Sequence, residues 1–132
     1  MKRTKISAPV KWLVLNGLVT GRTLDFGCGH GFDADQFGFD KWDPNFHPDW
    51  PKGEYDTILC NYVLNVIEPD RRKWVIDQIR GFLAKDGIAY FTVRRDIKGT
   101  TETSRGTTQY RVNPRMDFVH NGGHFGIYRL QK

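Results

Sequence analysis

The sequence predicts one domain of α/β fold with a mostly parallel sheet, and three observations support that prediction. The chain has 132 residues, which is a usual size for a single domain. Up to Val93, short apolar runs typical of buried strands alternate with helical segments, as in a parallel sheet covered by crossover helices. Beyond Val93 the chain carries two strand-like runs, so we expect an antiparallel C-terminal edge.

The first part of the chain supplies the elements around a glycine-rich turn. Ser7 is suited to N-cap the first helix, and Gly17 is suited to stop it. Pro, Gly and Asn are dense between residues 45 and 53, which indicates a surface loop. The predicted elements are a helix over 7–16, a strand over 23–26, a glycine-rich turn over 27–31, a short helix over 32–37 and a strand over 38–42.

The second part adds the longest predicted helix and the remaining strands. Glu68-Pro69-Asp70 is typical of a helix start, and apolar residues then recur at helical spacing. Lys85-Asp86-Gly87 is expected to turn the chain into a strand rich in β-branched and aromatic residues. The predicted elements are a strand over 55–62, a helix over 71–83, a strand over 88–93, and edge strands over 109–112 and 124–130.

Composition narrows the classes of function. No apolar run reaches the roughly 18 to 20 residues of a membrane span, and no secretory signal is visible. Cys28 and Cys60 form no CxxC pair and indicate neither a disulfide framework nor a zinc site, so a reducing cytoplasm is expected. The formal net charge of +5 and the pI of about 9.4 allow nucleic acid as a partner. Charge alone does not decide this, because many basic proteins bind no nucleic acid.

The strongest functional signal lies between Leu24 and Gly31, where a hydrophobic strand ends in Asp25 and a GxGxG turn follows. Glycines allow positive φ and close approach of a ligand, and a strand-end acid can accept hydrogen bonds from a ligand's amino group. The pattern predicts a nucleoside-cofactor loop, with a purely structural turn as the alternative. Phe32 stands where dinucleotide loops have a third glycine, which argues against NAD, and no Gly-Lys-Ser/Thr follows as in a P-loop.

A second acid ends the next predicted strand. Asp43 could bind both ribose hydroxyls of a nucleoside, and Asp40 competes for that role. Pro44 ends the strand directly after Asp43, which favours Asp43 because its carboxylate then lies at the edge of the sheet where ligands bind. The alternative is that both acids are only solvated.

Three segments resemble successive motifs of class I S-adenosylmethionine (SAM)-dependent methyltransferases, namely 24–31, Trp42-Asp43-Pro44 and 55–67. The resemblance covers residues 7 to 95 and implies a minimal Rossmann-like fold with SAM as cofactor. More narrowly, Ser7-Ala8-Pro9, Trp42-Asp43-Pro44 and 62–68 resemble methyltransferases linked to DNA phosphorothioation and to phage-like genomes.

The resemblance assigns a cofactor pocket to the ends of the first three strands. The acid and glycines of the first strand end would hold the methionine part of SAM, and Asp43 would hold the ribose. Asn61 and Tyr62 would face the sulfonium and the acceptor, while Asp33 fits either a polar pocket position or a first-turn helix acid. The implied pocket residues are Asp25, Gly27, Cys28, Gly29, Asp43, Asn61 and Tyr62.

The sequence departs from the family in its short connections. About a dozen residues join Gly31 to Asp43, and the chain after Val93 is short for the usual strands and helices. We therefore expect a minimal sheet, and an acceptor that is large or bound with help from a second subunit of a homo-oligomer. The segment over 98–108 is either a lid or a connection.

The sequence does not single out one catalytic residue, because methyl transfer relies on positioning and requires no obligatory acid or base. Asn121-Gly122-Gly123 is typical of a tight turn, and the two histidines that flank it make a poor metal site. The candidates for a base are Tyr62, Tyr110, Asp117, His120 and His124.

The acceptor could be nucleic acid, protein or a small molecule. Asn61 is followed by Tyr62-Val63, so the Asn-Pro-Pro-aromatic motif of DNA amino methylation is missing, as is a Pro-Cys nucleophile for C5-cytosine chemistry. Two other functions remain open: a SAM-binding accessory module without its own activity, and a basic nucleic-acid-binding domain without cofactor.

Overall fold

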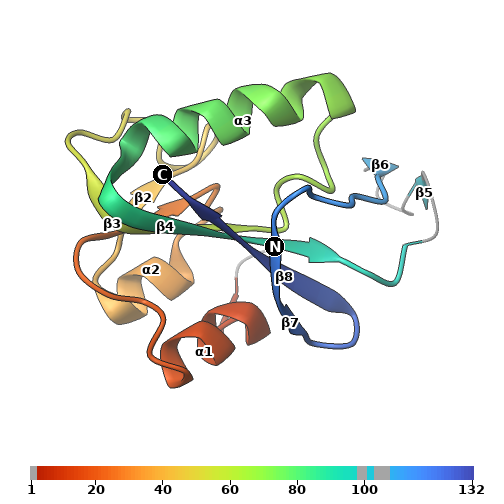
Figure 1. Cartoon of the computed structure of the whole chain (residues 1–132), viewed down its shortest axis with the longest axis horizontal. Coiled ribbons are helices and arrows are strands. Elements are labelled where there is room, and N and C mark those ends of the chain that lie inside the picture. Colours follow the sequence, from red (N-terminus) through yellow and green to blue (C-terminus); the bar gives the residue numbers. More distant parts are fainter. Residues whose placement is uncertain (1–2, 98–100, 103–107) are drawn as a thin grey trace.

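The computed structural model describes residues 3–97, 101–102 and 108–132 and contains a six-stranded mixed sheet (Figure 1). The strand order is β2-β1-β3-β4-β8-β7. These strands are β1 (Thr23–Phe26), β2 (Asp40–Trp42), β3 (Tyr55–Asn61), β4 (Leu83–Arg94), β7 (Asp117–Asn121) and β8 (Phe125–Gln131). The helices of the described residues are α1 (Ala8–Leu15), α2 (Phe32–Phe37) and α3 (Pro69–Phe82).

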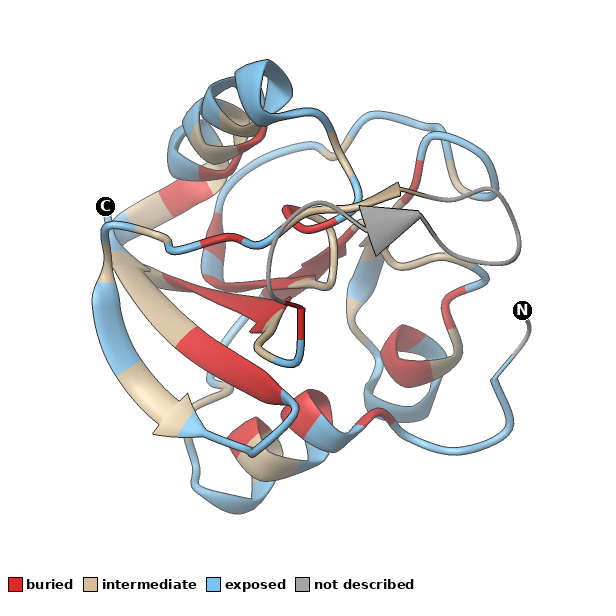
Figure 2. Ribbon diagram, turned by 90° about the vertical axis from the view of Figure 1, so that its right-hand side faces the viewer, coloured by how far each residue is buried: buried red, intermediate tan, exposed pale blue. Residues whose placement is uncertain are grey.

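The first four strands are parallel. β1 pairs with β2 and β3, and β3 pairs with β4, while β8 runs antiparallel to β4. The predicted sheet, mostly parallel with an antiparallel C-terminal edge, is confirmed. The carboxyl ends of β1 to β4 therefore meet at one edge of the sheet, which we call the carboxyl edge and which faces the viewer in Figure 2. The opposite edge is called the amino edge.

Helices cover both faces of the sheet, with α3 on one face and α1 and α2 on the other (Figure 1). In β3, the fully buried Ile58 packs in the core under α3, whereas the next residue, Leu59, packs against Leu13 of α1. Successive side chains of β3 therefore point to opposite faces of the sheet, and both faces are buried. Burial of each such side chain contributes about 1.5 to 3 kcal/mol, so the parallel strands carry most of the core.

Ser7 occupies the N-cap position of α1, but its side chain makes no capping hydrogen bond. Its hydroxyl donates instead to Oδ2 of Asp33 at 2.7 Å, and its backbone N–H donates to Oδ1 at 3.0 Å. Both residues are buried. The start of α1 is therefore joined to the first turn of α2, directly after the glycine-rich turn.

One prediction for the C-terminal part of the sheet, the edge strand over 109–112, differs from the structure. Only Thr108–Gln109 forms a strand there, β6, and it pairs with β5 (Thr101–Glu102) outside the main sheet, so an edge strand over 109–112 is wrong. The backbone N–H of Tyr110 donates to the carbonyl of Asn65 at 2.8 Å. This contact holds the segment over the loop that follows β3 rather than along the sheet.

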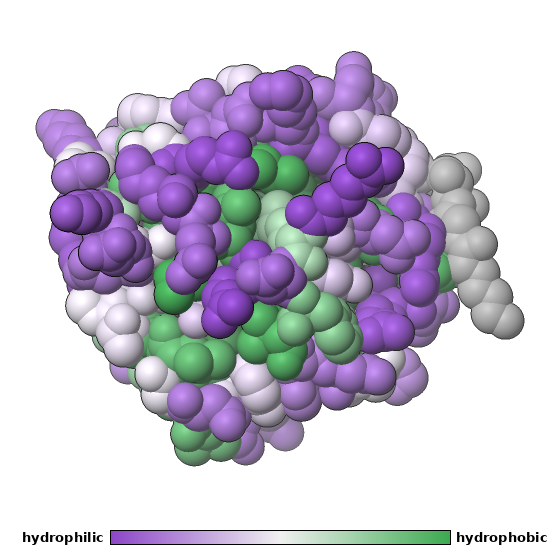
Figure 3. Space-filling view, in the orientation of Figure 1, coloured by the Kyte–Doolittle hydropathy of each residue, from purple (hydrophilic) through white to green (hydrophobic). Residues whose placement is uncertain are grey.

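The edge position belongs to β7, which pairs antiparallel with β8. The predicted tight turn between these strands is present, and Gly123 adopts a φ of +89° in it. Hydrophobic surface lies where α1 approaches this hairpin, surrounded by hydrophilic side chains (Figure 3). Within the described ranges, no helix has the length and apolar character needed to cross a membrane.

The predicted turn Lys85-Asp86-Gly87 lies inside β4 as an irregularity. Tyr55 pairs with Leu83 and Thr57 pairs with Ile88, so the residues between them on β4 form an excursion from the ladder. Asp86 adopts a φ of 65° at this point, as such an excursion requires. β4 therefore begins directly at the end of α3.

Candidate functional site

The glycine-rich turn after β1 is shaped by two glycines with different surroundings. Gly27 has a φ of +85°, and a Cβ there would lie 2.5 Å from Cγ2 of Val63. Gly29 has a φ of +60°, but a Cβ there would meet no atom within 4 Å. Gly27 is thus required by packing, whereas Gly29 borders open space that a ligand can enter.

Asp43, directly after β2, holds this turn in place. Its Oδ2 accepts from the backbone N–H of Gly29 at 2.8 Å, and its Oδ1 accepts from the N–H groups of Asn45 and Phe46 at 2.9 and 3.2 Å. Asp40, the competing acid, lies at the other end of β2 and accepts from the hydroxyl of Tyr55 at 2.6 Å. Of the two acids, Asp43 is the one beside the glycine-rich turn.

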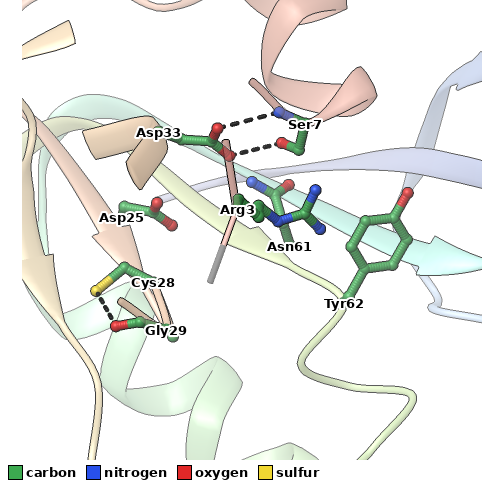
Figure 4. Close-up of a pocket in the computed structure, with 9 residues that line it drawn as sticks. Arg3, Ser7, Asp25, Cys28, Gly29, Asp33, Asn61 and Tyr62 are labelled. Carbon is green, nitrogen blue, oxygen red and sulfur yellow. Dashed lines mark hydrogen bonds between the residues drawn. The ribbon is translucent and has the colours of Figure 1, made fainter. Parts of the chain in front are cut away.

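Two adjoining cavities open at the carboxyl edge. The smaller, of about 150 Å³, lies between the glycine-rich turn and the end of β3 (Figure 4). The larger, of about 770 Å³, extends from Asp43 to α3. Both are lined by Gly27, Asn61 and Tyr62. The pocket residues implied by the resemblance, Asp25, Gly27, Cys28, Gly29, Asp43, Asn61 and Tyr62, all line one or both cavities.

A buried carboxyl group forms part of the smaller cavity. Asp25 is only 4% exposed, and burial, followed by the charges of Asp33 and Asp43, raises its pKa to about 7. The positive charge of Arg3 acts in the opposite direction. A cationic ligand group entering this cavity would stabilise the Asp25 carboxylate, because a nearby opposite charge favours the ionised form.

Asn61 and Tyr62 are positioned by the neighbouring strand β4. Oγ1 of Thr92 donates to Oδ1 of Asn61 at 2.8 Å, and the N–H of Tyr62 donates to the carbonyl of Thr92 at 2.8 Å. Tyr62 has a φ of 61°, a conformation that costs a residue other than glycine about 1 kcal/mol or more and is found at functional sites. Burial raises the pKa of Tyr62, so its phenol is a hydrogen-bond donor at neutral pH.

The two thiols are poor nucleophiles. Burial raises the pKa of Cys28 to about 12, and burial raises the pKa of Cys60 as well. Since the thiolate is the reactive form, neither side chain is suited to covalent catalysis at neutral pH. Cys28 contributes to the wall of the smaller cavity instead.

The other candidate bases lie away from the two cavities. His120 stacks on Trp12 of α1, with ring centroids 4.0 Å apart, and the His124 side chain is 92% exposed. Tyr110 lies beneath the Arg72 guanidinium, whose carbon is 5.7 Å from the ring centroid. Asp117 pairs with Arg129 at 3.3 Å. Among the candidates, Tyr62 is the one that lines both cavities.

The sequence analysis missed two residues of the smaller cavity, Arg3 and Ser7. Figure 4 labels Arg3 among the side chains that line this cavity, and shows Ser7 joined to Asp33 by two hydrogen bonds. The acid at position 33 was the only local signal, since nothing in the first residues indicates a contact with α2. Most of the predicted lid, residues 98–100 and 103–107, lies outside the described residues.

No family model and no curated protein matches the sequence. Solved structures do match the fold. A 1,6-didemethyltoxoflavin N1-methyltransferase from Burkholderia thailandensis, with S-adenosylhomocysteine (SAH) bound, has a TM-score of 0.70 at 16% identity, over 95% of this chain and 77% of that one. This chain has the fold of class I methyltransferases.

Two further structures agree with this fold. A SAM-dependent methyltransferase from Mesorhizobium loti matches with a TM-score of 0.57 at 12% identity, over 93% of this chain and 98% of that one. The magnesium protoporphyrin IX methyltransferase from Synechocystis PCC 6803, with SAM bound, matches with a TM-score of 0.55 at 14% identity, over 95% of this chain and 76% of that one. The Rossmann-like methyltransferase fold predicted from the sequence is therefore confirmed.

Proposed function

We propose that the protein binds SAM at the carboxyl edge and transfers its methyl group to an acceptor. One observation carries the proposal: the open glycine-rich turn, the two strand-end acids Asp25 and Asp43, and the end of β3 surround two adjoining cavities. The methyltransferase fold supports it, because structures with this fold contain SAM or SAH.

The residues of the smaller cavity fit the methionine part of SAM. Asp25 is a buried carboxyl whose raised pKa reflects burial beside two other acids, and the ammonium and sulfonium groups of SAM would supply the missing positive charge. The space beside Gly29 allows the ligand to approach the backbone. Asp43 would hold the ribose from the larger cavity.

When bound, SAM supplies an electrophilic methyl group: the sulfur–carbon bond breaks with its electron pair left on sulfur, a bond to the acceptor atom forms, and the acceptor's proton leaves to solvent. The protein's contribution is to hold donor and acceptor close and aligned. Asn61 and Tyr62, fixed by Thr92, would border the acceptor, and the Tyr62 phenol would donate a hydrogen bond to it. The narrower resemblance to methyltransferases linked to DNA phosphorothioation stays a prediction.

The first experiment is calorimetric titration with SAM, SAH and NAD. SAM and SAH are expected to bind with micromolar affinity and NAD is not, since Phe32 blocks the close helix approach that a pyrophosphate needs. Binding of SAM without methylation of any nucleic acid, protein or metabolite pool would instead favour an accessory module. Absence of SAM binding would contradict the proposal.

A matched pair of glycine variants tests the pocket itself. Gly29 and Gly38 have similar φ values, +60° and +72°, and a Cβ at either position would meet no protein atom within 4 Å. Gly29→Ala and Gly38→Ala should therefore lose similar unfolding free energy, about 1 kcal/mol each. SAM affinity should fall tenfold or more in Gly29→Ala only. Equal SAM affinity of the two variants would show that the glycine-rich turn does not line the SAM pocket.

A further inference from the structure

A groove of about 600 Å³ lies between α1 and α2, on the sheet face opposite α3 (Figure 1). We call it the α1–α2 groove. Of the large apolar side chains that line it, Leu15 is 74% exposed, and Ile6 and Phe37 are each 36% exposed. Val14 and Phe32 complete the apolar lining. Among the described residues, the groove shares no lining residue with the two cavities of the proposed SAM site.

α1 is apolar on the side that lines this groove as well as on the side that faces the core. Lys11 is the one polar residue among the eight of α1. Val10 and Leu13 are fully buried against the sheet, whereas Val14 and Leu15 line the groove. A helix that is apolar on all sides is typically buried on all sides. Within the described part of the chain, the side of α1 that carries Leu15 remains uncovered, so it is suited to a partner.

The charged side chains that line the groove are basic. Lys5 and Lys11 are both exposed there, and neither forms an ion pair among the described residues. The acids of α2 are engaged elsewhere: Asp33 is buried at the start of α1, and Asp35 pairs with Lys41 at 2.6 Å. The groove is therefore complementary to an apolar ligand that carries negative charge.

We propose that the α1–α2 groove binds an acidic, amphipathic segment of a partner protein. Apolar side chains at helical spacing would fill the groove between Leu15 and Phe37, and carboxylates beside them would meet Lys5 and Lys11. A second copy of this chain fits less well, because a two-fold contact through the groove would bring the same lysines together. An anionic membrane also fits less well, because the apolar surface is recessed and two lysines border it, against about four to eight in lipid-binding clusters.

The segment before α1 connects this groove with the proposed SAM pocket. Arg3 and Ser7 line the smaller cavity, whereas Thr4, Lys5 and Ile6 between them line the groove. A partner in the groove would hold this segment, and with it one wall of the cavity. SAM would then meet a preformed wall, so partner and SAM should strengthen each other's binding by the same factor. This coupling rests on the proposed function, but the groove itself does not.

The test is selection of displayed random peptides of about 16 residues, or roughly four helical turns, on the wild-type protein. Enriched peptides should carry apolar residues at helical spacing and an excess of Asp and Glu. Fluorescence anisotropy then measures their binding to variants. Leu15→Gln should weaken it about tenfold, whereas Phe118→Gln, the matched control at a half-exposed apolar side chain of β7, should leave it unchanged. Thermal melting checks that both variants fold.

A second pair of variants tests the charge of the groove. Lys5→Gln/Lys11→Gln should weaken peptide binding about threefold at low salt and remove most of its salt dependence. The matched control, Arg80→Gln/Lys85→Gln, removes two charges from α3 and β4 and should keep the wild-type affinity and salt dependence. Calorimetry with saturating peptide should show tighter SAM binding than without it, and SAM should raise the peptide affinity by the same factor.

Failure to enrich acidic peptides, or equal peptide affinities of Leu15→Gln and Phe118→Gln, would overturn the proposed groove. Self-association that Leu15→Gln abolishes would identify a second copy as the occupant instead. Leu15-dependent flotation with vesicles of equal parts phosphatidylcholine and phosphatidylserine would identify a membrane. Peptide binding without any change in SAM affinity would overturn the coupling alone. Peptide binding by a protein that binds no SAM would overturn the proposed function and the coupling, and would leave the groove as the binding site.

Discussion

Charged side chains at the two edges of the sheet have different surroundings. At the amino edge, Arg22 pairs with Asp40 at 3.1 Å and donates to the carbonyls of Lys52 and Glu54 at 2.7 and 2.9 Å. At the carboxyl edge, Asp25 is buried beside two further acids and has a pKa of about 7, and Tyr62 adopts a left-handed backbone conformation. Arg22 and Asp40 at the amino edge thus pair with each other, whereas Asp25 at the carboxyl edge has no ion-pair partner among the described residues.

We therefore expect residues at the amino edge to contribute to stability and residues at the carboxyl edge to contribute to ligand binding. Groups with perturbed pKa values and strained backbone conformations cluster at functional sites, where the surrounding structure holds them in place despite their energetic cost. Changes at the amino edge should therefore lower stability and spare SAM affinity. Changes at the carboxyl edge should lower affinity at a smaller cost in stability, or with a gain.

The largest effect is expected for Asp25→Asn in the pH dependence of stability. The folded-state pKa of Asp25, about 7, lies above its usual value of 3.8, so the folded protein holds a proton there that the unfolded chain releases between pH 4 and 7. Wild-type stability should therefore fall as pH rises through this window, by about 1.4 kcal/mol per pH unit and roughly 3 to 4 kcal/mol in total.

Asp25→Asn should lack this dependence and be the more stable protein at pH 8, although its SAM affinity is reduced. Urea unfolding of both proteins between pH 4 and 8 measures the difference. Parallel stability curves would show that Asp25 is not the group that titrates. In calorimetry, wild-type SAM binding at pH 6.5 should also release a proton, since the cationic ligand lowers the pKa of Asp25.

A smaller effect, in stability alone, is expected for Arg22→Ala. The change removes the ion pair with Asp40, two hydrogen bonds to carbonyls, and the stacking of the guanidinium on Tyr55 at 4.2 Å from the ring centroid. Because Arg22 is about half exposed, the unfolding free energy should fall by only about 2 kcal/mol. SAM affinity, measured by calorimetry below the melting temperature, should stay within twofold of wild type; a larger change would mean that the two edges are coupled.

The smallest effect distinguishes the two acids of one strand. Asp43→Asn places an amide among the N–H groups of Gly29, Asn45 and Phe46, and should weaken SAM binding about tenfold, or about 1.4 kcal/mol. Asp40→Asn, the control, lies at the amino edge and should keep the wild-type affinity. Similar SAM affinities for both variants would show that Asp43 does not hold the ribose.

Local signals explain which elements could be predicted from the sequence. β1 and α2 have the predicted bounds, because the glycines on both sides of α2 fix where the chain turns. β7 has no such signal, since Phe118 and Val119 stand between polar residues and become strand only by pairing with β8. A strand that forms only by pairing with a distant partner cannot be predicted from its own residues.

The site shows the same division. Asp25, Gly27 and Asp43 could be assigned to a pocket because strand ends and glycine turns are visible in sequence, and the structure places them at the cavities. Arg3 could not, because the first residues of the described chain meet the pocket beside Ser7, which contacts Asp33, a residue 26 positions away. No periodicity or motif marks such a contact.

The stack of His120 on Trp12, with an interplanar angle of 14°, joins the first helix to the last hairpin. These two elements are far apart along the chain, so the stack can form only after the strands between them have assembled. The contact closes the chain into a loop that contains the whole parallel part of the sheet, and separation of β7 from α1 would open that loop without moving a residue that lines either cavity.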